Sequence, residues 1–176
     1  MAFPKTALII VDIQNDFCTL GTRAVPSGEK VVPIINSLRK RLIFNSTYIA
    51  TDWHPLDHVC FSSNHAGKKP FDITILPNGK TQELWPDHCV QNQAGSYIHK
   101  DLIRDNTDVL IRKGLISDVD SKSSFGSPPE DTGLEKDLRK KGISRVFVVG
   151  LALDYCVKHT ALDAVKKGYL YILKLV

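Results

Sequence analysis

The stretch VFVVGLALDYCV, residues 146–157, joins an apolar run to a glycine and then to the expected start of a helix. A run of β-branched and aromatic residues without polar alternation predicts a strand that is buried on both faces. Gly150 permits a tight turn out of the strand, and Asp154 is a residue type that caps helix N-termini. The stretch therefore predicts a parallel strand followed by a crossover helix, which is the repeating unit of α/β folds.

Further apolar runs and helix-period segments alternate along the rest of the chain. The expected helices are residues 29–42, 134–141 and 157–167, and the last two end in Lys-Lys-Gly, which is typical of a helix C-terminus. The pattern predicts a three-layer αβα fold with a doubly wound, mainly parallel sheet of five to six strands. The expected strands are residues 7–11, 47–51, 109–112, 146–150 and 170–175.

The length of 176 residues predicts one domain, residues 1–176. Residues 54–106 interrupt the alternation and are rich in Pro, Gly, Asn, His and Ser, so we expect a long active-site loop there. The chain ends inside its last apolar run, where a doubly wound domain normally adds another helix. We therefore expect the C-terminal end to be incomplete.

The composition is that of an ordinary globular protein, with a net charge of +4 spread along the chain. No charge block indicates a nucleic-acid partner, and no apolar run approaches the roughly 18 residues that span a bilayer. We expect a cytoplasmic protein, monomeric or homo-oligomeric. The four cysteines are scattered, so we expect reduced thiols.

Reactive residue types follow three of the predicted strands, at the edge where ligands bind in open parallel sheets. Asp12 is a candidate general base whose pKa burial would raise. Lys113 is a candidate partner for a carboxylate, and Cys156 would lie at a helix N-terminus that favours a thiolate and can bind an oxyanion. Each residue alone also fits a structural role, as a turn aspartate, a solvated lysine or a buried inert cysteine.

Another strand end carries a candidate metal site. Asp52 and His54 are two residues apart, so in an extended backbone both side chains point to the same side. His88 is a candidate third ligand, and His58 and His65 are further candidates. This donor set suits zinc, iron or manganese, although a histidine-rich loop can also be polar surface.

Six strings in the same order resemble the isochorismatase-like cysteine hydrolases over nearly the whole chain, and within that family the nicotinamidase (pyrazinamidase) type. They are VDIQNDF (11–17), TDWHP (51–55), WPDHCV (85–90), KG (113–114), DSKSSF (120–125) and GLALDYCV (150–157). No single string would suffice, but their shared order makes the resemblance specific.

The resemblance implies a triad of Asp12, Lys113 and the nucleophile Cys156. It also implies a cis peptide between Leu151 and Ala152, with the Ala152 and Cys156 N–H groups as the oxyanion hole. The implied metal ligands are Asp52, His54 and His88, with His58 as a candidate fourth ligand for one divalent ion (Zn, Fe or Mn). The implied substrate-binding residues are Phe17, Trp85 and Tyr155.

The implied activity is hydrolysis of nicotinamide, or of pyrazinamide-like amides, to the acid and ammonia through a thioester, as a step of NAD salvage. Asp16 is expected to be a structural hydrogen-bond acceptor. Alternatives are a family hydrolase that acts on isochorismate, a carbamoyl or a ureido compound, and a catalytically silent metal-binding protein. Redox sensing by Cys156 would require a second cysteine close to it.

Overall fold

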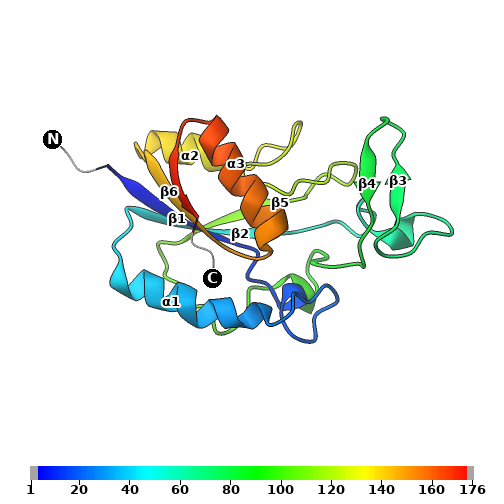
Figure 1. Cartoon of the computed structure of the whole chain (residues 1–176), viewed down its shortest axis with the longest axis horizontal. Coiled ribbons are helices and arrows are strands. Elements are labelled where there is room, and N and C mark those ends of the chain that lie inside the picture. The colour runs from blue at the N-terminus through cyan, green and yellow to red at the C-terminus, as the bar shows by residue number, and fades with distance from the viewer. Residues whose placement is uncertain (1–3, 174–176) are drawn as a thin grey trace.

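In the computed structural model, which describes residues 4–173, five parallel strands form the central sheet (Figure 1). Their order is β5-β2-β1-β6-β7, so the chain leaves β1 first toward one edge and later toward the other. The five strand predictions are confirmed to within two residues, except that residues 174 and 175 of the last one lie outside the described part. The strands are β1 (Thr6–Val11), β2 (Ser46–Asp52), β5 (Val109–Lys113), β6 (Arg145–Gly150) and β7 (Leu170–Leu173).

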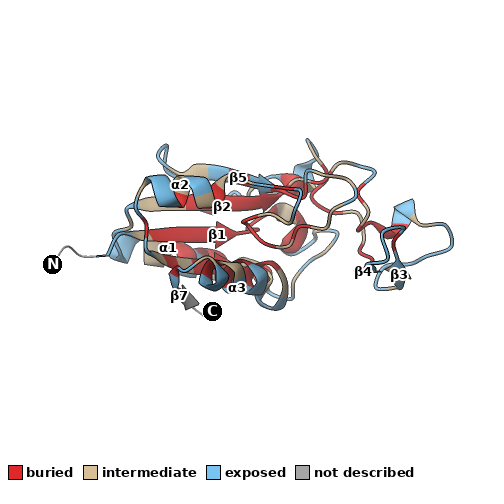
Figure 2. Cartoon of the chain, turned by 90° about the horizontal axis from the view of Figure 1, so that it is seen from above, coloured by how far each residue is buried: buried red, intermediate tan, exposed pale blue. Residues whose placement is uncertain are grey.

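Helices cover both faces of the sheet, as the apolar strands require. Helix α1 (Val31–Arg41) packs on one face, and α2 (Leu134–Lys140) and α3 (Lys158–Lys166) pack on the other (Figure 1). The central strands are buried almost throughout, as Figure 2 shows. The three-layer α/β prediction is therefore confirmed, with two separate apolar cores on the two sides of the sheet.

Two helix starts differ from the prediction. A 3₁₀ turn, Gly28–Lys30, occupies the first residues of the predicted helix 29–42. Before α3, the chain forms a π-helical turn, Leu153–Val157, whose N-cap residue is Ala152 and which has no side-chain cap. The expectation that Asp154 caps this helix is therefore wrong, because Asp154 lies inside the turn and its side chain is exposed.

Residues 54–106 are more ordered than the predicted loop. They contain an antiparallel hairpin, β3 (Ile73–Ile75) and β4 (Thr81–Glu83), which projects from the end of the molecule where the strands end (Figure 1). Within residues 4–173, no helix combines the length and the apolarity that crossing a bilayer requires. All four cysteines are free and buried.

Candidate active site

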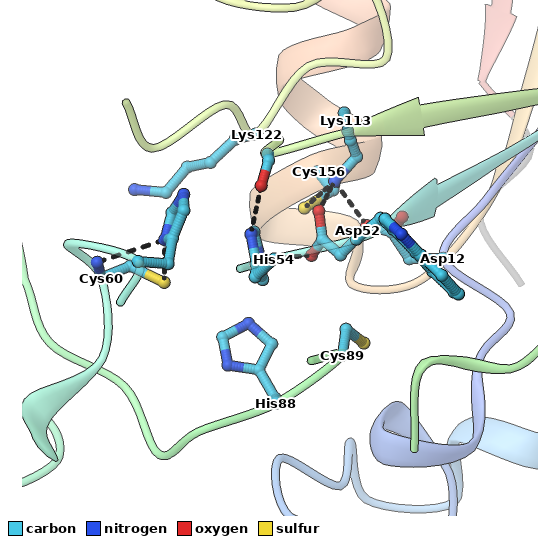
Figure 3. A network of polar contacts seen from close by, with 12 residues as sticks. Asp12, Asp52, His54, Cys60, His88, Cys89, Lys113, Lys122 and Cys156 are labelled. Carbon is cyan, nitrogen blue, oxygen red and sulfur yellow. Dashed lines mark hydrogen bonds and ion pairs between the residues drawn. The ribbon is translucent and has the colours of Figure 1, made fainter. Parts of the chain in front are cut away.

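The Lys113 ammonium group joins three side chains at the carboxyl ends of neighbouring strands. Its Nζ lies 3.0 Å from Asp12 Oδ2 and 3.4 Å from Cys156 Sγ, and it donates a short hydrogen bond to Asp52 Oδ1 (Figure 3). Lys113 has 0 % exposure, so the alternative of a solvated lysine is excluded. Strands β1, β2 and β5 and the turn after β6 supply one residue each, which is why residues far apart in sequence meet here.

Burial and shared charge set the ionisation of this cluster. Burial, together with the nearby Asp52 charge, raises the pKa of Asp12 to about 6, although Lys113 opposes the shift. Burial would also raise the pKa of Asp52, but Lys113 and His54 hold it well below its usual range. Burial opposes the charge of Lys113 as well, yet Asp12 and Asp52 raise the pKa of its ammonium group well above the ordinary value. Lys113 is therefore a permanent cation that two carboxylates share.

Burial at Cys156 favours the neutral thiol over the thiolate. Burial raises its pKa well above the ordinary value; Lys113 opposes this shift, and Asp12 adds to it. Loss of hydration thus opposes the thiolate that the helix N-terminus was expected to favour. A nucleophile at Cys156 needs a base, and ligand atoms of Asp12, Asp52 and Cys156 all lie within 4.8 Å of one another.

The backbone before Cys156 has the predicted cis peptide between Leu151 and Ala152. Ala152 and Cys156 both line a cavity of about 330 Å³, and Cys156 is the member of the Lys113 cluster that lies on its wall. Within residues 4–173, the Ala152 N–H donates no hydrogen bond. This group is therefore available to an acceptor on a bound molecule.

Asp52, His54 and His88 form a compact set of metal-type ligands beside the cluster (Figure 3). Their ligand atoms lie within 4.8 Å of one another, and all three side chains are buried. His54 Nδ1 donates to the Gly114 carbonyl at 3.0 Å and His88 Nδ1 donates to the Pro86 carbonyl at 2.7 Å. Each imidazole therefore keeps its Nε2 free of backbone hydrogen bonds, so that this nitrogen can bind a metal when it carries no proton. The donor set fits a divalent transition metal.

His58 lies close to this set but uses its ring nitrogens differently. Its ring centroid is 4.2 Å from that of His54. Its Nε2 donates to the Val119 carbonyl at 3.1 Å, and its Nδ1 lies 2.9 Å from Cys60 Sγ. His58, His54 and Cys60 form a second group whose ligand atoms lie within 4.8 Å, so His58 as a metal ligand stays a prediction. His65 Nε2 donates to the Val59 carbonyl at 2.8 Å.

The three aromatic residues predicted to bind substrate all line the cavity beside Cys156. The rings of Trp85 and Tyr155 meet edge to face with centroids 5.2 Å apart, and Phe17 packs against His88 at 5.6 Å. Sequence reasoning missed Arg23, whose Cζ lies 3.6 Å from the centroid of the Trp85 ring. No motif marks Arg23, because its role depends on where a loop side chain points.

Buried polar residues hold the site in place. Gln14 Nε2 donates to the Asp52 carbonyl at 2.7 Å, and Gln14 Oε1 accepts from the Asp52 N–H at 2.8 Å. Asp16 Oδ2 accepts from the Cys89 N–H at 2.7 Å, which confirms its predicted structural role. Glu130 accepts from the Gly114 N–H at 3.0 Å. Sequence reasoning missed Gln14 and Glu130, although a glutamine three residues after the end of a buried strand is a detectable signal.

Comparison with known proteins gives consistent matches. Residues 6–173 match the isochorismatase domain family. A nicotinamidase of Acinetobacter baylyi is 43% identical over 164 residues, which cover 92% of this chain and 75% of that protein. The structure of the yeast nicotinamidase bound to the inhibitor nicotinaldehyde has a TM-score of 0.86 and 34% identity, over 93% of this chain and 83% of that one. A pyrazinamidase of Pyrococcus horikoshii in complex with zinc has a TM-score of 0.79 and 34% identity, over 97% and 78% of the two chains.

Proposed function

The chain belongs to the isochorismatase family, and from that premise we propose that it is an amide hydrolase that converts nicotinamide to nicotinate and ammonia. The observation that carries the proposal is the contact of one buried ammonium, Lys113, with Asp12, Asp52 and the Cys156 thiol. The nicotinamidases matched above, from a bacterium and from yeast, support the choice of substrate. Such a reaction would place the protein in the salvage of nicotinamide for NAD.

Asp12 is the proposed base for both halves of the reaction. Its pKa of about 6 leaves it mostly ionised at neutral pH, and its buried Oδ1 has no hydrogen-bond partner within residues 4–173. In the first half, Asp12 takes the thiol proton while Cys156 Sγ adds to the carboxamide carbon, and the carbonyl electron pair moves to oxygen. Asp12 then gives that proton to the nitrogen, and the carbon–nitrogen bond breaks as the oxygen electron pair re-forms the carbonyl. Ammonia departs, and a thioester remains on Cys156.

In the second half, Asp12 takes a proton from water while the water oxygen adds to the thioester carbon. The carbon–sulfur bond then breaks, Asp12 returns its proton to Cys156, and the product leaves as nicotinate after its carboxyl group releases the second water proton. In both additions the negative oxygen would lie against the N–H groups of Ala152 and Cys156, which are fixed before the substrate arrives. The unused Ala152 N–H supports this role.

Lys113 is proposed to stabilise the negative charge on Asp12 and Cys156 throughout the reaction. The Lys113 ammonium group contacts both carboxylates and the sulfur, so it stays in contact with the negative charge whether that charge lies on Asp12 or on Cys156. A cation held in a buried site needs no reorganisation when charge develops, which is the basis of electrostatic catalysis.

Asp52, His54 and His88 are the proposed ligands of one divalent metal ion, zinc, iron or manganese. When bound, the ion would supply a coordination position for the ring nitrogen and so orient the carboxamide toward Cys156. The zinc in the matched pyrazinamidase structure supports this proposal. Trp85 and Phe17 border the space that the ring would enter.

Ammonia release from nicotinamide tests the proposal. The purified protein would be assayed after chelation and after reloading with zinc, iron or manganese, beside Cys156→Ala. Cys18→Ala is the matched control, because it removes another buried free thiol outside the cavity beside Cys156. We expect release that is restored by metal, abolished by Cys156→Ala and retained by Cys18→Ala. No release from any metal-loaded form would refute the proposal and direct the assay to isochorismate, carbamoyl and ureido substrates.

A further inference from the structure

The Arg23 guanidinium lies where the proposed metal and ring would meet. Its Cζ is 3.6 Å from the centroid of the Trp85 ring and 5.8 Å and 5.5 Å from those of Phe17 and Tyr155. Its Nη1 is 3.2 Å from His88 Nε2. One side chain thus covers the aromatic wall of the cavity and contacts a proposed metal ligand at the same time.

The contact with His88 has a defined direction. The Pro86 carbonyl can only accept, so the 2.7 Å bond from His88 Nδ1 places the ring proton on Nδ1. His88 Nε2 therefore has a single lone pair, and Arg23 donates a hydrogen bond to it. A metal ion needs that same lone pair and would bring a second positive charge beside the guanidinium. Arg23 in this position and a metal on His88 exclude each other.

Arg23 is held in a way that permits displacement. None of the ion pairs found within residues 4–173 involves it, so no carboxylate holds its charge there. Its partners are aromatic ring faces and one imidazole, which retain a guanidinium only modestly. The side chain also lines the 330 Å³ cavity, and the exposed Asp154 carboxylate lies on the wall of the same cavity. Space and a counter-charge are both present outside the metal position.

We propose that Arg23 is a cationic placeholder for the metal ion, which means that its guanidinium occupies the lone pair of His88 Nε2 until a metal ion binds there. Metal binding then displaces Arg23 into the cavity and so exposes the Trp85 face to the substrate ring. The identity of that ring rests on the proposed function, but the exclusion of metal by Arg23 does not. Metal and ring binding are then coupled through a side chain that need not touch the reacting atoms.

Metal affinity without any substrate tests the first half of the proposal. Zinc binding to chelator-stripped protein would be measured by calorimetry for the unaltered chain, Arg23→Met and Arg112→Met. Arg112 is a matched control, because its Cζ also stacks on a tryptophan, 3.9 Å from the Trp53 ring centroid, but does not line the cavity. We expect Arg23→Met to bind zinc about tenfold more tightly, ~1.4 kcal/mol, and Arg112→Met to leave the affinity unchanged. Equal zinc affinity of Arg23→Met and the unaltered chain would overturn the proposal.

Benzamide tests the second half, because its ring has no nitrogen that could bind the metal directly. Its affinity would be measured by ligand-observed NMR in the Cys156→Ala background, which prevents turnover. The chain that keeps Arg23 would be compared with the chain that also carries Arg23→Met, each with and without zinc. We expect zinc to strengthen benzamide binding severalfold when Arg23 is present and to leave it unchanged in Arg23→Met. The same zinc effect in both chains, or none in either, would overturn the coupling.

These measurements are separate from the test of function. Tighter zinc binding by Arg23→Met in a chain that releases no ammonia from nicotinamide would refute the proposed function and leave the placeholder standing. Normal ammonia release, with no effect of Arg23→Met on zinc or benzamide affinity, would overturn the placeholder proposal and support the proposed function.

Discussion

Replacing Lys113 with methionine would remove the ammonium charge that lies between two buried carboxylates. The methionine side chain has nearly the same length and is apolar, so it fills the space without the ammonium group. Lys113 has 0 % exposure, and its Nζ contacts both Asp12 and Asp52. Removal of one partner from a buried ion pair typically costs about 3–5 kcal/mol, and we expect the free energy of unfolding at pH 7.5 to fall by that amount.

The loss should depend on pH with a definite sign. In the unaltered protein the pKa of Asp52 is lowered, so its contribution to stability is present above the unfolded value of 3.8 and lost as the pH falls through the folded pKa. In Lys113→Met the lowering by Lys113 is gone, so burial raises the pKa of Asp12 further above its unfolded value and raises that of Asp52 against the opposing effect of His54. The charged carboxylates then lower the stability at neutral pH, and proton binding removes this destabilisation. The destabilisation should therefore shrink as the pH falls from 7.5 toward 5.

Urea unfolding of the stripped protein at pH 7.5, 6.5 and 5.5 measures the effect. Lys141→Met is the matched control, because the Lys141–Asp137 ion pair of 2.7 Å has side chains that are 36% and 32% exposed. An exposed pair contributes about 0–1 kcal/mol, with little pH dependence in this range. The reasoning would be refuted if Lys113→Met lost no more stability at pH 7.5 than Lys141→Met, or lost the same amount at every pH.

Two further predictions concern the metal ligands and the base. Gly114→Ala should lower zinc affinity at least tenfold in calorimetry, because an added Cβ would lie 2.3 Å from His54 Cε1. Gly142→Ala is the matched control, since its φ of +69° is close to the +68° of Gly114 but its added Cβ would have no neighbour closer than 3.9 Å; it should keep the zinc affinity. If both variants bind zinc equally, the collision does not displace His54. The kcat/KM of the metal-loaded protein for nicotinamide should fall on the acid side of pH 6, since Asp12 must be ionised to act as a base and its pKa, about 6 without a metal ion, falls when a cation compensates the Asp52 charge. A pH profile that stays flat down to pH 4.5 would show that another group takes the proton.

The sequence predicted the strands and the meeting of reactive residues well, for one physical reason. Short apolar runs that alternate with helix-period segments are typical of parallel strands in a covered sheet, and such strands bring their carboxyl ends to one edge. Asp52 and Lys113 each end a strand and Asp12 directly follows one, so their proximity follows from the topology. The three-residue strands of the hairpin β3–β4 were missed, because a run of that length has no measurable period.

What the sequence could not predict depends on burial and on side-chain direction. The preference of Cys156 for the neutral thiol follows from its loss of hydration and its closeness to two carboxylates, and a helix N-terminus alone indicates the opposite. Arg23 is an ordinary loop arginine in the sequence, and only the structure places its guanidinium over Trp85. Gln14 was quoted within a motif, yet its two hydrogen bonds to the backbone of Asp52 appear only when β1 and β2 are paired.

The shared ammonium group connects the proposed ring-binding and reacting halves of the site. Asp52 offers one oxygen to Lys113 and its other oxygen lies 3.6 Å from His54 Nε2, so the same carboxylate belongs to both halves. Any cation that binds beside His54 and Asp52 weakens the hold of Asp52 on Lys113 and reduces the negative charge that Asp12 faces. Asp52 is one of the causes that raise the pKa of both Asp12 and Cys156, so both values should fall when that charge is compensated. Occupation of the ligand set would thus prepare the thiol for attack through charge alone, without any movement of Cys156.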